Sequence, residues 1–525
     1  MSRRILILLG AVLLIAALLR LAWLGEIPAG LSHDETVKGY DAWSVLHTGR
    51  DQYGAWFPLV FRAIGDQREA VLPYLIVLSE AILGPTDLAV RLPTALAGLA
   101  LVAVLFLLGR EMYSTRIGLA AAALLAISPW HVQISRLAFR AGLLPLTTAA
   151  GLWLFLLALR RPRLMLPAGV VFGLGLHTYL AARLFLPLLL LGLLVIYHRP
   201  LLDRTSDGRR GWSGLWSRPL APFLTGVGLM ALPLAVWAAF HPADFVGHAA
   251  ESAGTGSVFR QAFDTVYRYV AYFGPRHLLT QGDPYPVPST GRFGALYWPV
   301  LPFAVIGLLR LAHRRQRADL LLLWWLIVYP IPAALTRGSH PDWLRATCGI
   351  GVMEIVAAVG IVAGFDWLRQ RMSSSMHHAA VATVAVLIAA NVTWFLWDYT
   401  RHFPDRAAYA FNDGIAQAID TLDDLDQGYD RIVLPADVAA VHDVYLFYSR
   451  YDPKRLLAEG LEDIAAPGEW ADVRGFGRHR VCDPSVCCGP GDLCLTRGAW
   501  TGPGTVLREI EDRTGRTAFT IVAGD

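Results

Sequence analysis

Charged residues are scarce in this chain of 525 residues: they make up 17% of it, whereas hydrophobic residues make up 55%. A soluble domain carries roughly a quarter charged residues, so the deficit excludes an ordinary soluble protein. Apolar runs near the roughly 20 residues that cross a bilayer recur through the first three quarters of the chain. The sequence therefore predicts a polytopic α-helical membrane protein.

Lysine is almost absent, because Lys38 and Lys454 are the only two and nearly all other basic residues are arginine. The formal net charge of +4 is mild, and the arginines stand at the ends of apolar runs instead of in one tract, which argues against a nucleic-acid partner. A cleavable leader is also missing: the apolar run after Arg3 and Arg4 is longer than a signal core and has no small-residue cleavage site. We expect an uncleaved first membrane helix.

Hydropathy and length predict about eleven membrane helices in a domain covering residues 1–397. A polar tail, 398–525, follows and alternates between strand and helix patterns: a strand at 429–437, a helix at 441–450 and a closing strand at 517–524. We expect this tail to be an α/β domain. The predicted membrane segments are 5–24, 88–108, 117–129, 141–159, 164–182, 184–198, 219–240, 293–311, 320–335, 345–365 and 379–397.

Basic residues assign the two sides of the membrane. If the segments alternate, the arginine-rich turns fall on one side, which the positive-inside rule makes cytoplasmic. The tail and two long loops, about 25–87 and 241–292, then lie outside the plasma membrane. One exception stands out, the stretch that carries Arg136 and Arg140. The cytoplasmic stretches are 3–4, 109–116, 160–163, 198–210, 310–317 and 369–378.

Cysteine is rare too, with five in the chain. Cys348 stands alone in an apolar segment and is predicted to pack in the core. The other four gather in the tail, without the two-residue gaps of zinc ribbons. Disulfides in an oxidising compartment are the favoured interpretation, with connectivity left open. These residues are Cys482, Cys487, Cys488 and Cys494.

The stretch "LSHDETVKGYDAW" (31–43) places adjacent carboxylates, Asp34 and Glu35, just after the first apolar run. Ser32 and Glu35 have capping-box spacing, which gives Glu35 a structural alternative. The capping box does not require a carboxylate at position 34. The sequence therefore leaves both a capping role and a chemical role open for this pair.

Several other stretches on the predicted outer side carry arginine or histidine close to the ends of membrane segments. Each has an ordinary alternative, such as a charged helix start for Arg68 or snorkelling for Arg91. Together they suggest a pocket for an anionic lipid headgroup, because charges are costly there and arginine binds phosphate bidentately. The predicted donor-binding residues are Arg68, Arg91, Arg136, Arg140, Tyr179, Arg183, His340 and Arg345.

Four motifs resemble the bacterial branch of the protein O-mannosyltransferase family: the Asp-Glu pair, "RLPTALAGL", "ISPWHVQISRLAFRAGLLPL" and "HPDWLRATCGIG". These are membrane glycosyltransferases of the GT-C superfamily, related to the enzyme that adds aminoarabinose to lipid A. The resemblance covers the membrane region. It implies a GT-C fold, a polyprenyl-phosphate-linked sugar as donor and a hydroxyl acceptor on a protein, glycolipid or polysaccharide.

The resemblance also implies roles for particular residues. Asp34 matches the family's catalytic acidic residue, Glu35 its partner, and Arg91 a functionally important arginine. Arg68 stands where the lipid-A branch has a phosphate-binding lysine, without that branch's surrounding motif. His340 and Arg345 fit a motif near the donor site. Some GT-C enzymes use a divalent metal, and no ligand set is assigned here.

The expected chemistry is an inverting transfer. A lipid phosphate departs without a proton, so one base for the acceptor hydroxyl and positive charge for the phosphate suffice. Nucleotide sugars are cytoplasmic, so an outward-facing transferase needs a lipid-carried donor. Two other classes stay open: a transporter or flippase of a lipid phosphate or glycolipid, and a non-catalytic scaffold or sensor. No internal repeat supports the first of these.

Overall fold

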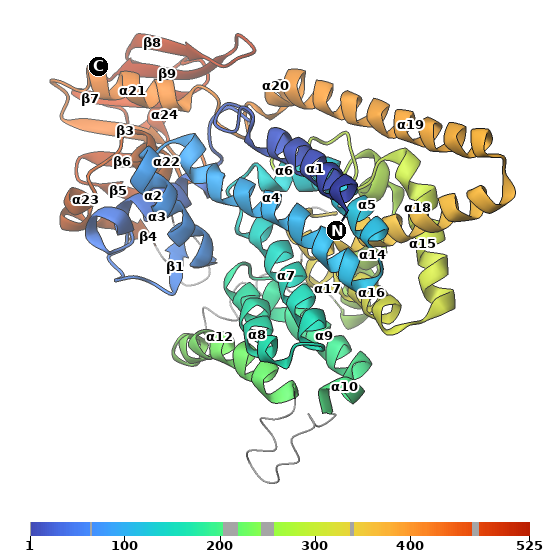
Figure 1. The fold of residues 1–525 in the computed structure, drawn as a ribbon. Helices are drawn as coiled ribbons and strands as arrows, with labels where there is room; N and C mark the ends of the chain where they lie inside the picture. The colour runs from blue at the N-terminus through green and yellow to red at the C-terminus, as the bar shows by residue number, and fades with distance from the viewer. Residues whose placement is uncertain (1, 64–65, 203–218, 243–256, 337–340, 465–471) are drawn as a thin grey trace. The chain divides into compact units, whose positions relative to one another are not determined.

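The computed structural model describes residues 2–63, 66–202, 219–242, 257–336, 341–464 and 472–525 (Figure 1). Their contacts divide the chain into two compact units. The helical unit comprises the described residues of Met1–Ala22, Thr94–Pro242 and Ser252–Trp397. The sheet unit comprises those of Trp23–Pro93 and Asp398–Asp525. One boundary coincides with the expected domain limit at residues 397 and 398, and the first loop belongs with the tail.

The helical unit consists of long apolar helices. Seven are long and apolar enough to cross a membrane, and the bent pair α5 and α6 makes an eighth if it is one span. The unit contains α1 (Arg3–Leu21), most of α4 (Asp87–Met112), α5 (Thr115–Ile127), α6 (Pro129–Ser135), α7 (Leu144–Ala158), α8 (Met165–Leu174), α9 (Ala182–Ile196), α10 (His198–Leu202), α12 (Leu220–Phe240), α14 (Val258–Ala271), α15 (Leu301–Arg314), α16 (Arg317–Val328), α17 (Ile331–Leu335), α18 (Val352–Arg371) and α19 (Ser374–Arg401).

The polytopic membrane architecture is confirmed, but the count of eleven spans is not. Each predicted segment has a helical counterpart. Three of these counterparts, α8, α9 and α15, are shorter than the 18 residues required of a candidate span in the described chain. Hydropathy locates apolar runs, but it does not give the length of the helix that forms within each run.

Small residues set the closest helix crossing in this unit. A Cβ at Gly360 would collide with the carbonyl of Phe303, and one at Gly307 with that of Val356. Helices α15 and α18 therefore pack backbone to backbone, as small residues permit in membrane helices.

The sheet unit contains a seven-stranded mixed sheet in the order β4-β5-β6-β3-β7-β9-β8. Strand β3 runs parallel to both β6 and β7, and the other pairs are antiparallel. The strands are β3 (Arg431–Pro435), β4 (Leu461–Ile464), β5 (Asp472–Phe476), β6 (His479–Cys482), β7 (Asp492–Arg497), β8 (Thr505–Glu511) and β9 (Thr517–Ala523). The predicted α/β tail is confirmed, including a strand within 429–437 and one within 517–524.

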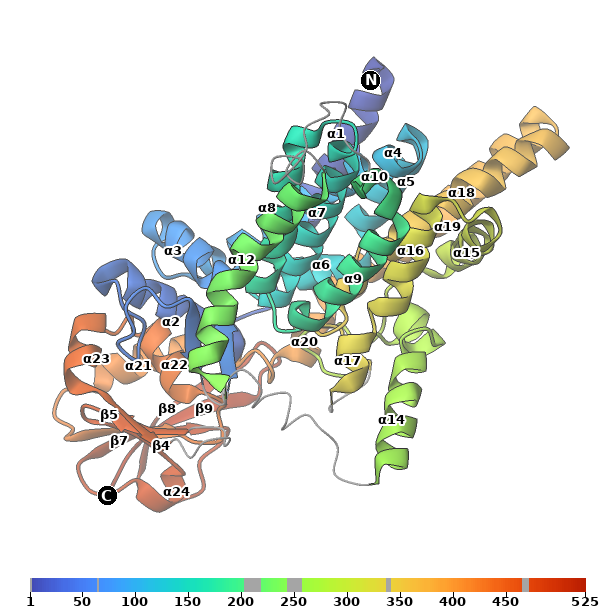
Figure 2. The ribbon, with the colours of Figure 1, turned by 90° about the horizontal axis from the view of Figure 1, so that it is seen from below.

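Helices cover the two faces of this sheet unequally (Figure 2). On one face lie α21 (Ile415–Leu425), α22 (Val441–Tyr448) and α23 (Pro453–Glu459), and on the other lies the one-turn α24 (Pro484–Cys487). A short helix, α20 (Phe403–Ala407), precedes them. The predicted helix at 441–450 is α22.

The first loop folds onto this domain. It consists of α2 (His33–Thr48), a hairpin of β1 (Val60–Ala63) and β2 (Asp66–Glu69), and α3 (Val71–Leu83). Helix α2 packs on α22, and Gly39 allows the approach, since a Cβ there would lie 2.5 Å from the Phe447 ring. The Tyr40 hydroxyl donates to the Tyr451 carbonyl at 3.2 Å. The helix that carries the Asp-Glu pair is therefore anchored by the tail.

Candidate active site

Helix α2 begins with the predicted capping box. The Ser32 backbone N–H and hydroxyl both donate to Glu35 Oε2, at 3.0 and 3.1 Å. Asp34 and Glu35 occupy the first turn, where carboxylates interact favourably with the helix dipole. The capping role that the sequence left open for Glu35 is confirmed, and it fixes the position of Asp34 beside it.

Three cationic or titratable side chains approach the Asp34 carboxylate. Arg68 Nη2 lies 3.3 Å and Lys38 Nζ 3.7 Å from its Oδ1. Nε2 of His33 lies 3.8 Å from its Oδ2. The Asp34 side chain is 35% exposed, whereas those of Arg68 and Lys38 are 7% and 2% exposed. Asp34 is thus the accessible member of a largely buried charge cluster.

Arg68 has hydrogen-bonding capacity that the protein does not use. Strand β2 places it opposite Phe61 in the hairpin. Its Nε and Nη1 are buried and have no hydrogen-bond partner among the described residues. Buried donors are normally satisfied, so two unpartnered guanidinium nitrogens beside an accessible carboxylate are an exception among the described residues.

Lys38 was not among the residues predicted for the site. It follows Asp34 by four residues on α2, which places both on one helix face. Its ammonium group also donates to the Asp34 carbonyl. The i, i+4 spacing in the sequence was a sufficient signal for this neighbour.

Glu35 is buried in a different arrangement. Arg91 Nε donates to its Oε1 at 3.0 Å and Arg91 Nη2 to its Oε2 at 3.2 Å, and both side chains are 0% exposed. Arg91 also donates to three carbonyls of the loop before α2, those of Leu24, Pro28 and Gly30. This geometry favours a positioning role for Arg91 over the phosphate contact expected from the sequence, because its guanidinium is enclosed and already bonded.

A second acidic group lies deeper along α2. Burial, followed by the neighbouring carboxylates of Asp51 and Asp443, raises the pKa of Asp41 well above its usual value, and Arg68 opposes the shift. Burial also raises the pKa of Asp51. The sequence alone did not predict this cluster, since Asp443 comes from the tail.

Arg136 of the helical unit binds the end of the first helix. Its Nη1 donates to the Leu19 and Ala22 carbonyls at 3.0 and 2.8 Å. Cations at a helix C-terminus satisfy its last carbonyls and its dipole. The geometry therefore accounts for this exception to the positive-inside rule by a capping contact, where the sequence suggested a phosphate.

The remaining predicted donor-binding residues also belong to the helical unit. Arg345 Nε lies 3.3 Å from Asp342 Oδ2, and its Nη1 donates to the Thr336 hydroxyl at 2.9 Å. Arg140 opens a 3₁₀ turn before α7. Tyr179 and Arg183, like Arg140, are half-buried. His340 lies outside the described residues.

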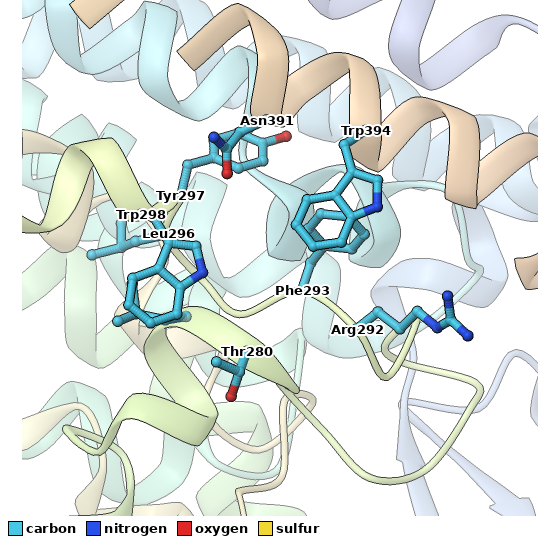
Figure 3. Close-up of a pocket in the computed structure, with 9 residues that line it drawn as sticks. Thr280, Arg292, Phe293, Leu296, Tyr297, Trp298, Asn391 and Trp394 are labelled. Atoms are coloured by element: carbon cyan, nitrogen blue, oxygen red, sulfur yellow. The ribbon is translucent and has the colours of Figure 1, made fainter. Parts of the chain in front are cut away.

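The helical unit also contains a small aromatic cavity of about 120 Å³ (Figure 3). Trp394 of α19 and Phe293 pack edge to face in its wall, with ring centroids 4.9 Å apart. None of the described donor-binding candidates lines it. Its lining residues are Leu279, Thr280, Arg292, Phe293, Leu296, Tyr297, Trp298, Asn391 and Trp394.

The four tail cysteines form two local disulfides, Cys482–Cys487 and Cys488–Cys494. They fasten α24 and the end of β6 to β7. Cys348 is free and buried, as predicted. In the described part of the chain, no group of three or more His, Cys, Asp or Glu side chains is arranged to hold a metal ion.

Comparisons with known proteins agree with the resemblance found in the sequence. Residues 69–206 match the family model described as dolichyl-phosphate-mannose-protein mannosyltransferase. A search of curated protein sequences finds no match.

Two solved structures are similar to this one. ArnT from Cupriavidus metallidurans, bound to undecaprenyl phosphate, has a TM-score of 0.57 and 15% identity over 100% of both chains. The oligosaccharyltransferase AglB from Archaeoglobus fulgidus, in complex with an inhibitory peptide and a dolichol-phosphate, has a TM-score of 0.50 and 17% identity. That match covers 84% of this chain and 64% of the archaeal one, so this chain spans less than two thirds of that protein. The chain therefore has the GT-C membrane fold of these enzymes, completed by a C-terminal sheet domain.

Proposed function

We propose that this protein transfers a sugar from a polyprenyl-phosphate carrier to a hydroxyl group of an acceptor, with inversion at the anomeric carbon. Asp34 is the base, and Arg68 holds the departing phosphate. Arg91 and the Glu35 carboxylate position the helix that carries Asp34. The acceptor belongs to one of three classes: a protein, a glycolipid or a polysaccharide.

The observation that carries this proposal is the pairing of an accessible carboxylate with an unsatisfied guanidinium. Asp34 and Arg68 approach to 3.3 Å, and two donors of Arg68 are buried without a partner in the described chain. An anion that accepts hydrogen bonds from Nε and Nη1 removes the cost of these unsatisfied donors. Phosphate is suited to this role because its several oxygens accept charge-assisted hydrogen bonds, so different oxygens can meet the two donors.

The chemistry balances without a second acid. The acceptor oxygen attacks the anomeric carbon while its proton passes to the Asp34 carboxylate. The bond from that carbon to the phosphate oxygen breaks, and its electron pair leaves with the phosphate. Charge spreads onto the leaving oxygens, where Arg68 and the nearby Lys38 stabilise it. Attack opposite the leaving group inverts the anomeric centre.

Two features support an extracytoplasmic site. The arginine distribution places the first loop and the tail opposite the cytoplasmic turns. The tail also contains two disulfides, which persist in oxidising compartments. Helix α2 packs on this tail, so both lie on the same side.

The similarity to ArnT and AglB supports the carrier. Their structures contain undecaprenyl phosphate and a dolichol-phosphate. We propose a polyprenyl phosphate for this chain on the same fold, with Arg140, Tyr179, Arg183, His340 and Arg345 as further donor contacts. No observation favours a transporter: Asp34 lies in α2, outside the candidate membrane spans.

A structure with undecaprenyl phosphate in lipid nanodiscs tests the proposal. We expect a phosphate oxygen within hydrogen-bond distance of Arg68 Nε or Nη1, and the Asp34 carboxylate facing the same cavity. A phosphate bound away from Arg68, or an Asp34 side chain sealed from the lipid, would contradict it.

A further inference from the structure

The sheet unit contains a cavity of about 600 Å³ that the proposed reaction does not use. Its volume falls in the range of roughly 300–1,000 Å³ that is usual for small-molecule sites. It is lined by the loop after β3, the start of α22 and residues of β4, β5, β6 and α24. None of the residues around Asp34 contributes to it.

The position of this cavity follows from the topology of the sheet. Strands β3 and β6 are parallel, and the cavity extends along them from Arg431, at the start of β3, to their carboxyl ends at Ala436 and Cys482. The chain leaves β3 toward α22 on one face of the sheet and leaves β6 toward α24 on the other (Figure 2). Ligands of open α/β sheets bind in the crevice that such diverging connections create at the carboxyl ends of the strands.

Arginines dominate the charged lining. Arg431 donates through Nε and Nη2 to Asp492, at 2.8 and 2.9 Å, and its Nη1 takes no part in that pair. Arg480 Nη1 lies 3.2 Å from Glu462 Oε1. Arg474 is exposed and has no partner among the described residues. Three guanidinium groups thus face one lining carboxylate, that of Glu462.

The start of α22 adds unsatisfied backbone donors. Its N-cap is Ala440, with φ at 50°, and no side chain caps the helix. The first-turn N–H groups and the positive end of the helix dipole therefore face the lining formed by Val441 and His442. His442 is buried. Its Nε2 lies 3.2 Å from Asp443 Oδ2 but makes no hydrogen bond within the described chain.

We propose that this cavity, at the carboxyl ends of β3 and β6, binds a small anionic ligand: a phosphate or carboxylate group carried on a body the size of a sugar. The guanidinium groups of Arg474 and Arg480 and the first turn of α22 bind the anionic group. The apolar floor, formed by Val433, Val473 and the Cys482–Cys487 disulfide, contacts the ligand body. The site is independent of the transfer reaction.

Calorimetric titration of the full-length protein in nanodiscs of zwitterionic lipid tests this. The probes are glucose, glucose 1-phosphate, glucuronate and inorganic phosphate. We expect both anionic sugars to bind and glucose to bind at least about tenfold more weakly, as for loss of a charged hydrogen-bonding group. Inorganic phosphate should bind more weakly than glucose 1-phosphate. Equal affinity for glucose and glucose 1-phosphate, or binding of none of the four probes, would overturn the proposal.

Substitutions assign the binding to this cavity. Arg480→Ala should weaken the binding of glucose 1-phosphate about tenfold. Arg508→Ala should leave the affinity unchanged, because Arg508 lies on the exposed strand β8 at the opposite edge of the sheet. Glu462→Gln should strengthen binding, because it removes the lining carboxylate. Asp34→Asn should not change binding, which separates this site from the active site. Weaker binding by Glu462→Gln, or equal losses in both arginine variants, would contradict it.

Discussion

Asp34 and Glu35 are consecutive carboxylates in the first turn of one helix, and each pairs with an arginine, yet their surroundings differ in every other respect. Glu35 is fully enclosed and saturated by Arg91 and Ser32. Asp34 is 35% exposed, and its partner Arg68 retains unused donors. The Glu35 pair therefore has no donor left over, whereas Arg68 keeps two buried donors without a partner in the described chain.

The two arginines differ in the same way. Arg91 donates hydrogen bonds to Glu35 and to three loop carbonyls. These bonds hold Leu24, Pro28 and Gly30 close to the start of the helix. Arg68 belongs to a hairpin and contacts Asp34 through one nitrogen. The buried Glu35–Arg91 pair therefore fixes the position of the Asp34–Arg68 pair. Substitutions in the first pair should lower stability, and substitutions in the second should lower activity.

The largest effect is expected from Asp34→Asn. The amide keeps the size of the side chain but cannot accept the acceptor proton, so the transfer rate should fall by about 10²–10⁴-fold. Transfer from a polyprenyl-phosphate sugar is measured on purified protein, with thermal unfolding as the check on folding. Asp405→Asn, an exposed first-turn carboxylate in α20, is the matched control. Full activity in Asp34→Asn would show that Asp34 is not the catalytic base.

Arg91→Met should act on stability instead. It leaves the Glu35 carboxylate buried without its cation, which costs roughly 3–5 kcal/mol, and the yield of monodisperse protein should drop. Adding Glu35→Gln to Arg91→Met should recover part of the loss, because no buried charge remains. A variant that folds normally but loses activity would place Arg91 in the chemistry.

Arg68→Ala should weaken the binding of undecaprenyl phosphate without unfolding the protein. Hydrogen bonds to charged groups contribute about 1.5–3 kcal/mol, so the dissociation constant should rise about 10- to 100-fold. Arg62→Ala, on the neighbouring strand of the same hairpin, supplies the comparison. Binding is measured by native mass spectrometry. Identical affinities in the two variants would remove Arg68 from the phosphate site.

Ser32→Ala removes one half of the capping box. An N-cap serine contributes about 1 kcal/mol, so the melting temperature should fall slightly and activity should decline with it, since Asp34 depends on this turn. Ser257→Ala, which removes the N-cap of α14, should leave activity unchanged. The same loss of activity in both variants would show a general effect of capping.

The smallest effect concerns Asp41, whose pKa is raised chiefly by burial and next by Asp51 and Asp443. Between the usual value near 4 and the raised value, the folded state keeps a proton that the unfolded state releases, so stability falls as pH rises. Asp41→Asn should flatten this part of the pH profile of thermal unfolding, on the side above pH 4. Asp437→Asn, which is exposed, should not, and an unchanged profile in Asp41→Asn would refute the assignment.

Local patterns in the sequence predicted local structure well. Capping-box spacing predicted the start of α2, and alternation of strand and helix patterns predicted the α/β tail. Apolar run length predicted where membrane helices lie but not how many span, because α8, α9 and α15 are apolar yet short. Periodicity carries no information on where such helices sit within a bundle.

Pairings between distant residues were harder to predict. The sequence grouped Arg68, Arg91 and Arg136 as phosphate ligands because each is a cation in an outer stretch. In the structure Arg91 binds Glu35 and loop carbonyls, Arg136 binds the end of α1, and Arg68 approaches Asp34. Such roles depend on which carbonyls and carboxylates tertiary folding brings near. Those contacts join residues that are distant in the sequence, as Asp34–Arg68 (34 positions), Glu35–Arg91 (56) and Leu19–Arg136 (117) illustrate.

The contact of Gly39 with Phe447 has a consequence for biogenesis. Helix α2, which carries the Asp-Glu pair, is synthesised about 400 residues before its packing partner α22. At roughly 5–20 residues per second, this delay amounts to some tens of seconds. Until the ribosome has passed α22, helix α2 lacks this packing partner. The packing of α2 is therefore a late step of folding, and truncation before Phe447 should leave α2 without it.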